Sequence, residues 1–120
     1  MANQYGVIVD RIDISEKMIC LAKIRIKEEG LKNIIDLEKA DCLEIHYQNV
    51  NDIAYSWGVF LHIKVKKLLF KNIFNALVSG GRLFFLDYCL SQNKIESKFK
   101  TYLHKRKYSL VKIRYYIKIL

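Results

Sequence analysis

The sequence has no proline, only five glycines and no long apolar run. The absence of proline fits one folded unit better than two domains joined by a linker. The longest uncharged stretch in the middle of the chain, residues 53–63, has 11 residues, whereas a membrane-spanning helix needs about 20 apolar residues. We therefore expect no membrane span. The first residues also lack the basic and apolar regions of a secretory signal, so we expect a cytoplasmic protein.

Cysteine is scarce and odd in number, with Cys20, Cys42 and Cys89 far apart in apolar surroundings. This pattern argues against a disulfide framework and against a zinc site. Free cysteine commonly behaves as a small core residue. We therefore predict three buried thiols in a reducing compartment and no bound metal.

Acidic residues are scarce in the second half of the chain. Residues 1–60 hold 7 Lys/Arg and 10 Asp/Glu, whereas residues 61–120 hold 14 and 2, a net charge of +12. The segment 94–118 carries 9 Lys/Arg against Glu96 alone. Such a segment can form a surface for RNA or an anionic membrane, but it is more commonly a solvated face. The composition leaves these alternatives open.

The first half of the chain shows a strand pattern, a helix pattern and a second strand pattern. The β-branched run 7–12 predicts a strand that ends at Asp13. Ser15 then offers an N-cap to a helix that Gly30 closes. The segment 33–40 predicts the next strand, which leads into Asp41.

The second half continues this alternation. Its predicted elements are a strand at 53–55, a helix at 64–78 that stops at Ser79–Gly81, a strand at 82–86, a helix at 94–108 and either a helix or a frayed end at 109–120. Lys66 lies off the apolar stripe of its helix, and the apolar run 82–86 predicts a strand covered on both faces. Together these patterns predict one α/β layer with a parallel sheet.

Polar residues follow the predicted strands. In an open parallel sheet, ligands bind at the carboxyl ends of the strands, and the residues there are Asp13, Asp41, Ser56 and Asp87 with Tyr88. An acid at such a position can accept hydrogen bonds from ribose hydroxyls. Asp13 can equally begin a turn and Asp41 can cap the next segment. The spacing alone does not decide between these roles.

Five segments carry a resemblance to a known family: IDISEKMICLA, KADCLEI, AYSWGVFLHI, SGGRLFFLDYCLS and FKTYLHKRKYSL. In this order they resemble the class I S-adenosylmethionine-dependent methyltransferases, and among them the phosphoethanolamine N-methyltransferases of protozoan parasites and nematodes. The resemblance covers about residues 5–112. It implies an incomplete Rossmann-like methyltransferase fold, with a mostly parallel sheet and flanking helices, and a partial methyltransferase domain over residues 1–120.

The resemblance also implies roles for individual residues. His62 matches the catalytic histidine of the family. The cofactor, S-adenosyl-L-methionine, would be held by Asp13, Ile14, Asp41, Cys42 and Ser56. The phosphate of a small phosphobase substrate would be held by Tyr88, Arg106 and Tyr108. An arginine with two phenol donors suits a dianionic phosphate, and an imidazole suits proton removal from an amine near neutral pH.

The sequence departs from this family at several points. The glycine-rich first motif and the N-terminal lid are absent, so we expect two strands with exposed edges unless a protein partner completes the sheet. Trp57 and Gly58 stand where the family has an arginine and an aspartate, and Arg11 replaces a glycine shortly before Asp13. These departures argue against full catalysis by this chain alone and leave open that cofactor binding is lost.

Two classes of function follow. The first is N-methylation of phosphoethanolamine-type phosphobases in phosphocholine synthesis, by a fragment or an impaired copy of such an enzyme. The alternative is a non-catalytic binding or interaction module whose basic C-terminal face holds RNA or an anionic membrane. Because part of the basic charge then anchors one phosphate at Arg106, a nucleic-acid partner is the second choice.

Overall fold

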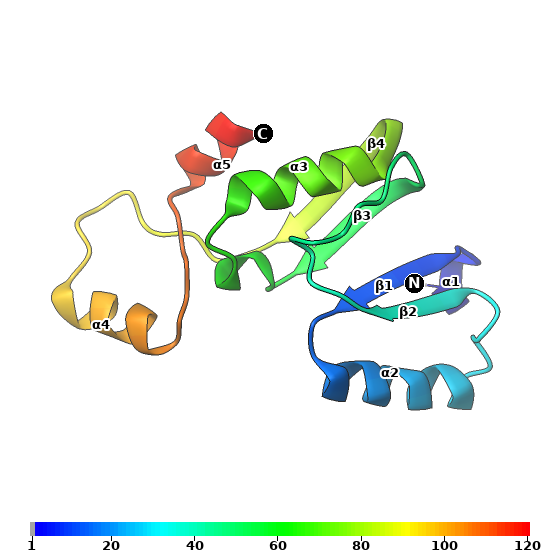
Figure 1. Ribbon diagram of the computed structural model, residues 1–120. Coiled ribbons are helices and arrows are strands. Elements are labelled where there is room, and N and C mark those ends of the chain that lie inside the picture. The colour runs from blue at the N-terminus through cyan, green and yellow to red at the C-terminus, as the bar shows by residue number, and fades with distance from the viewer. Residues whose placement is uncertain (1) are drawn as a thin grey trace. The chain divides into compact units, whose positions relative to one another are not determined.

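The computed structural model describes residues 2–120 and shows a chain of alternating strands and helices (Figure 1). Its elements are α1 (Ala2–Tyr5), β1 (Val9–Asp13), α2 (Glu16–Glu28), β2 (Ile35–Lys39), β3 (Asn51–Trp57), the 3₁₀ helix η1 (Phe60–His62), α3 (Lys66–Ala76), β4 (Leu77–Leu86), α4 (Ser97–Lys105) and α5 (Ile113–Ile119). They fall into two compact units, residues 1–45 and 46–120. Each unit is described by itself.

The first unit is the predicted strand, helix and strand, preceded by the short α1. β1 and β2 are parallel, with Asp13 opposite Lys39. α2 packs against this two-stranded sheet, and its buried residues are Ile19 and Ala22. Gly30 follows the helix with a φ of +68°, a conformation that glycine adopts without steric cost. The predicted end of the helix is therefore confirmed.

The second unit contains the other parallel pair of strands, β3 and β4, with Trp57 opposite Leu86. α3 packs along one face of this pair (Figure 1). Side chains from Arg82 to Leu86 alternate between exposed and half-buried, and Phe84 and Leu86 are exposed. The prediction that strand 82–86 is covered on both faces is wrong, because in the described part of this unit α3 covers one face only.

The glycines after α3 have a different role from the one predicted. α3 ends at Ala76 and β4 begins at the next residue, so the helix does not extend to Ser79–Gly81. Instead, this segment lies where the register between β3 and β4 shifts. A Cβ atom on Gly81 would lie 2.9 Å from the carbonyl oxygen of Val78, closer than real Cβ contacts. The segment thus requires glycine for close approach of the backbone.

The core of the second unit is an aromatic cluster of four rings whose centroids lie between 5.1 and 5.9 Å apart. Its members are Phe60, Phe70, Phe85 and Tyr116. Beside this cluster, the side chain of Lys66 is only 1% exposed. The prediction that Lys66 lies off the buried face is wrong, because its ammonium group finds two backbone carbonyl acceptors inside the unit.

The C-terminal part of the chain contains two short helices. α4 is shorter than the predicted helix at 94–108, and α5 confirms the helical alternative for residues 109–120. The backbone N–H of Leu90 donates a hydrogen bond to the carbonyl of Val111 at 2.9 Å, which joins the segment before α5 to the segment after β4. α5 in turn contributes Tyr116 to the aromatic cluster.

Each strand pairs with one other strand within residues 2–120: β1 with β2, and β3 with β4. The sequence predicts exposed edges for two strands unless a protein partner completes the sheet. Among the same residues, no helix is long and apolar enough to cross a membrane.

The prediction that the three cysteines are buried is wrong. Cys20 and Cys89 are exposed and Cys42 is half-buried. Cys20 follows the buried Ile19 on α2, and one helical step of about 100° turns its side chain away from the buried face. Apolar neighbours in sequence therefore did not indicate apolar surroundings in space.

Candidate functional site

Two carboxylates lie at one edge of the sheet in the first unit. Asp13 is the last residue of β1, and Asp41 follows β2 after Ala40. The backbone N–H of Ala40 donates to the carbonyl of Asp13 at 3.2 Å, so the two strand ends are hydrogen-bonded to each other. Because β1 and β2 are parallel, their carboxyl ends meet at this edge. The structure thus brings Asp13 and Asp41 together at the predicted place.

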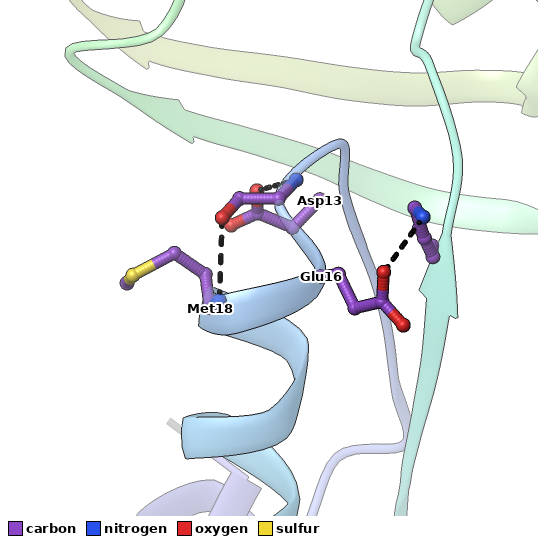
Figure 2. Close-up of polar contacts among 5 residues, drawn as sticks. Asp13, Glu16 and Met18 are labelled. Carbon is purple, nitrogen blue, oxygen red and sulfur yellow. Dashed lines mark hydrogen bonds and ion pairs between the residues drawn. The ribbon is translucent and has the colours of Figure 1, made fainter.

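Asp13 holds the turn between β1 and α2. Its Oδ1 accepts a hydrogen bond from the backbone N–H of Ser15 at 2.9 Å (Figure 2). Its Oδ2 lies 3.6 Å from the guanidinium of Arg11, an ion pair in which the arginine side chain is half exposed. The turn role that the sequence left open for Asp13 is therefore present, and Arg11 faces this carboxylate.

The start of α2 is fixed by two further contacts. The hydroxyl of Ser15 accepts a hydrogen bond from the backbone N–H of Met18 at 3.3 Å, which confirms the predicted N-cap. The carboxylate of Glu16 accepts a hydrogen bond from the ammonium of Lys39 at 3.1 Å (Figure 2). This pair links the first turn of α2 to the end of β2, next to Asp13.

Asp41 makes the equivalent local contact after β2. Its Oδ1 accepts a hydrogen bond from the backbone N–H of Leu43 at 2.8 Å. The neighbouring Cys42 is half-buried, and burial, together with the negative charge of Asp41, raises the pKa of its thiol. Cys42 is therefore a neutral thiol at physiological pH. Ile14, the other predicted cofactor residue of this unit, is exposed.

Ser56 is the predicted cofactor residue that lies in the second unit. It is half-buried on β3, opposite Phe85 in the register. β3 ends one residue later at Trp57, and Gly58 continues the chain with a φ of +63°.

In the second unit, three of the predicted residues lie in one group. The exposed imidazole of His62 lies edge-on against the phenol ring of Tyr108, with centroids 5.3 Å apart. Tyr108 contacts the ring of Tyr102 on α4, with centroids 6.4 Å apart. The guanidinium carbon of Arg106 lies 5.6 Å from the centroid of the Tyr102 ring. We call these four residues, His62, Tyr102, Arg106 and Tyr108, the His62 cluster.

A hydrogen-bonded turn after α4 positions two members of this cluster. The N–H of Lys107 donates to the carbonyl of His104, and the N–H of Tyr108 donates to the carbonyl of Leu103, both at 3.0 Å. This is the Schellman arrangement, in which the residue with positive φ is usually glycine. Here Lys107 has a φ of +55°. The turn fixes the backbone on both sides of Lys107, at Arg106 and at Tyr108.

Tyr88 lies apart from this group. It follows β4 and is 71% exposed, and its N–H donates to Oδ1 of Asp87 at 2.9 Å. The other oxygen of Asp87 accepts a hydrogen bond from the hydroxyl of Tyr116 at 3.3 Å. Burial and the charge of Asp87 raise the pKa of Tyr116. Across residues 2–120, no hydrogen bond or ring contact joins Tyr88 to the His62 cluster.

The sequence does not single out Tyr102 for this site, although one signal was available. Tyr102 stands four residues before Arg106, which places the two side chains one turn apart on a helix. Lys66 had no such signal, because helical periodicity does not take account of the carbonyls of Phe60 and Ile63, which lie just before α3. Tyr116 had none because its contacts come from elements that are distant in sequence. No group of three or more histidine, cysteine or acidic side chains in the described part of the chain has the geometry of a metal site.

Comparisons with known proteins identify the family of the chain. Residues 8–114 match the protein family described as a methyltransferase domain. Phosphoethanolamine N-methyltransferase 1 of Zea mays is 38% identical over 97% of this chain and 23% of its own length. Phosphoethanolamine N-methyltransferase of Plasmodium falciparum is 31% identical over 98% of this chain and 44% of its own length. The chain thus spans from about a quarter to less than half of these relatives.

Among solved structures, phosphoethanolamine N-methyltransferase 2 of Haemonchus contortus superposes with a TM-score of 0.93 at 27% identity. It covers 98% of this chain, and the chain covers 28% of it. This likeness confirms the predicted Rossmann-like α/β fold with parallel strands and flanking helices. The resemblance to phosphoethanolamine N-methyltransferases is also confirmed, and plant enzymes join the protozoan and nematode ones. Because residues 8–114, most of the chain, match the family, the chain belongs to the methyltransferase domain family.

Proposed function

We propose that this chain binds a phosphoethanolamine-type phosphobase through the His62 cluster and Tyr88, and that it serves the N-methylation of that amine in phosphocholine synthesis. The observation that carries the proposal is the His62 cluster, which brings an imidazole, phenol rings and a guanidinium into one group. The Haemonchus enzyme, whose structure is similar, was solved with phosphomonomethylethanolamine and S-adenosylhomocysteine. That complex supports the same substrate class here.

Arg106 and the tyrosine hydroxyls suit the phosphate end of such a substrate. A guanidinium offers several N–H donors in a fixed plane, and charge-assisted hydrogen bonds to phosphate are among the strong ones in proteins. Arg106 is exposed at the end of α4, and its contact with the Tyr102 ring restricts its orientation. In this proposal Tyr88 and Tyr108 add phenol donors.

His62 suits the amine end. Methyl transfer to nitrogen requires a neutral lone pair, so an ammonium substrate must first lose a proton, and a positioned imidazole is a common acceptor. The ring of His62 is exposed and is held on one side by Tyr108, which leaves it accessible to a small ligand. His62 would therefore take the proton while Arg106 holds the phosphate.

The methyl donor fits the strand edge of the first unit. Its ribose hydroxyls and adenine amine need hydrogen-bond acceptors, and Asp13 and Asp41 provide carboxylates at adjacent strand ends. We assign the cofactor to these two residues with Ile14 and Cys42. The role of Ser56 in cofactor binding stays a prediction from the resemblance. S-Adenosyl-L-methionine supplies an electrophilic methyl group when it is bound.

Calorimetric titration of phosphocholine into the full 120-residue chain tests the substrate assignment. We expect heat of binding from the wild type and at least a roughly tenfold weaker affinity in Arg106→Ala, about 1.4 kcal/mol. Lys105→Ala is the matched control, because Lys105 is an exposed neighbour with the same charge. Equal weakening by both substitutions, or no heat from the wild type, would contradict the proposal.

A second candidate function rests on the exposure of the basic segment. Eight of the nine Lys/Arg residues between 94 and 118 are exposed, and α4 buries no side chain. This surface suits RNA or an anionic membrane, as the charge pattern alone suggested. Phosphate contacts release counterions, so binding to an oligonucleotide must weaken as salt rises. Affinity that stays constant with salt excludes the nucleic-acid version.

We propose further that residues 1–120 form part of one methyltransferase domain. The family match supports this, since it runs without interruption from the first unit into the second. A cytoplasmic location and a protein partner at the strand edges stay predictions.

A further inference from the structure

Lys66 makes an unusual pair of contacts for a lysine on a surface helix. It begins α3, and its ammonium group donates hydrogen bonds to the carbonyl oxygens of Phe60 and Ile63, both at 2.8 Å. These two carbonyls lie on either side of His62 in the sequence. The buried ammonium is therefore hydrogen-bonded to the backbone of the turn that carries His62.

The same ammonium faces the end of β4. It lies 5.8 Å from the ring centroid of Tyr116, whose hydroxyl donates to Asp87. Burial lowers the pKa of Lys66, and the negative charge of Asp87 opposes that shift. Asp87 also accepts the N–H of Tyr88. Lys66 thus lies between the turn that carries His62 and the strand end that carries Tyr88.

The opposite side of the turn is held by the segment after α4. The N–H of Ser109 donates to the carbonyl of Leu61, and the ring of Tyr108 packs against His62. The carbonyls of Phe60, Leu61 and Ile63 therefore each accept a hydrogen bond from a group outside η1.

We propose that Lys66 is a positioning residue, which holds the turn 60–63 so that the imidazole of His62 meets Tyr108 at the phosphobase site. This role rests on the proposed function, because the position of the His62 imidazole matters for proton removal only if the site binds an amine. Packing alone does not require a lysine here: burying an ammonium group is costly, and an apolar residue of similar volume often serves stability as well. A methionine at this position cannot donate the two hydrogen bonds to the carbonyl oxygens.

Nuclear magnetic resonance of the labelled chain tests this role. In Lys66→Met, we expect the ring signals of His62 to move toward those of a solvated histidine, while the ring signals of Phe70 and Phe85 keep their positions. Lys71→Met is the matched control, since Lys71 is an exposed lysine on the same helix. It should leave the signals of all three rings in place. Unchanged His62 signals in Lys66→Met would overturn the proposal.

If Lys66→Met does not fold, a measurement on the wild type decides. Couplings across hydrogen bonds from the Lys66 ammonium nitrogen to the carbonyl carbons of Phe60 and Ile63 are expected, and their absence would overturn the proposal. The affinity for phosphocholine distinguishes a failure of the proposed function from a failure of the positioning role of Lys66. Where the wild type binds phosphocholine, Lys66→Met should weaken binding about tenfold and Lys71→Met should not. A wild type that binds no phosphocholine contradicts the proposed function, whereas the ring signals of His62 still test the positioning.

Discussion

The imidazole ring of His62 meets the phenol ring of Tyr108 edge to face, with centroids 5.3 Å apart and planes inclined by 68°. Neighbouring backbone groups meet as well, since the N–H of Ser109 donates to the carbonyl of Leu61. His62 precedes β4 in the sequence and Tyr108 follows it, so the fold of the second unit brings the two rings together. The consequences of this arrangement for stability and binding can each be measured.

Phe70 should be a major contributor to the stability of the second unit. It is 7% exposed and contacts the other three rings of the aromatic cluster. We expect Phe70→Ala to lower the free energy of unfolding by about 3–5 kcal/mol, as measured by urea denaturation, because truncation leaves a cavity. Phe74→Ala is the control on the same helix, where the ring is 78% exposed, and should cost less than about 1 kcal/mol. Similar losses for both would contradict the assigned core.

The stability of the chain should fall in alkaline solution because of Tyr116. The pKa of Tyr116 in the fold lies above its ordinary value of 10.0, so above that pH the unfolded chain loses this proton first. Fewer protons are then bound in the unfolded state than in the native state, and stability decreases with rising pH by at most about 1.4 kcal/mol per unit. Tyr116→Phe should remove the part of this decrease that Tyr116 causes.

The difference between wild type and Tyr116→Phe is the quantity to measure, by denaturation at several pH values from 10.0 upward. The raised pKa values of Cys42 and Cys89 act in the same direction from 9.0, and the difference cancels them. Lys66 has the opposite sign: its pKa is lowered from 10.5, so stability rises with pH below that value. A constant difference across the series would contradict the burial of the Tyr116 hydroxyl.

The backbone conformation of Lys107, in the turn after α4, should lower the free energy of unfolding. Its φ of +55° places a side chain in the left-handed region, which costs an ordinary residue about 1–2 kcal/mol. Glycine lacks this cost but gains freedom in the unfolded chain. We therefore expect Lys107→Gly to raise the free energy of unfolding by about 1 kcal/mol in urea denaturation. Lys100→Gly, at an exposed position in the middle of α4, should instead lower it by about the same amount.

Patterns that depend on neighbours in sequence predicted the fold well. The cap at Ser15, the turn at Gly30 and the alternation of strands and helices all arise from contacts within a few residues. The strand-end position of Asp13 and Asp41 follows from the parallel pairing that this alternation implies. The resemblance to methyltransferases supplied His62, Arg106 and Tyr108, which the fold brings into one group with Tyr102.

The errors lie where side chains meet groups outside their own helix or strand. Helical periodicity assigned Lys66 to the solvent, because the period of a helix does not take account of the carbonyls of Phe60 and Ile63, which precede α3 and accept hydrogen bonds from the ammonium. The apolar run at 82–86 predicted cover on both faces, although α3 packs on one. Ser79–Gly81 was expected to stop a helix, whereas it accommodates a shift in strand register.

In the proposed complex, the His62 cluster holds a phosphobase with its amine at His62 and its phosphate at Arg106. Intermolecular nuclear Overhauser effects from the N-methyl protons of phosphocholine to the full chain measure this arrangement. We expect these effects to reach the ring protons of His62 and Tyr108, and to disappear in Arg106→Ala. Effects confined to other residues, such as Phe99 on α4, or effects that persist in Arg106→Ala, would contradict it.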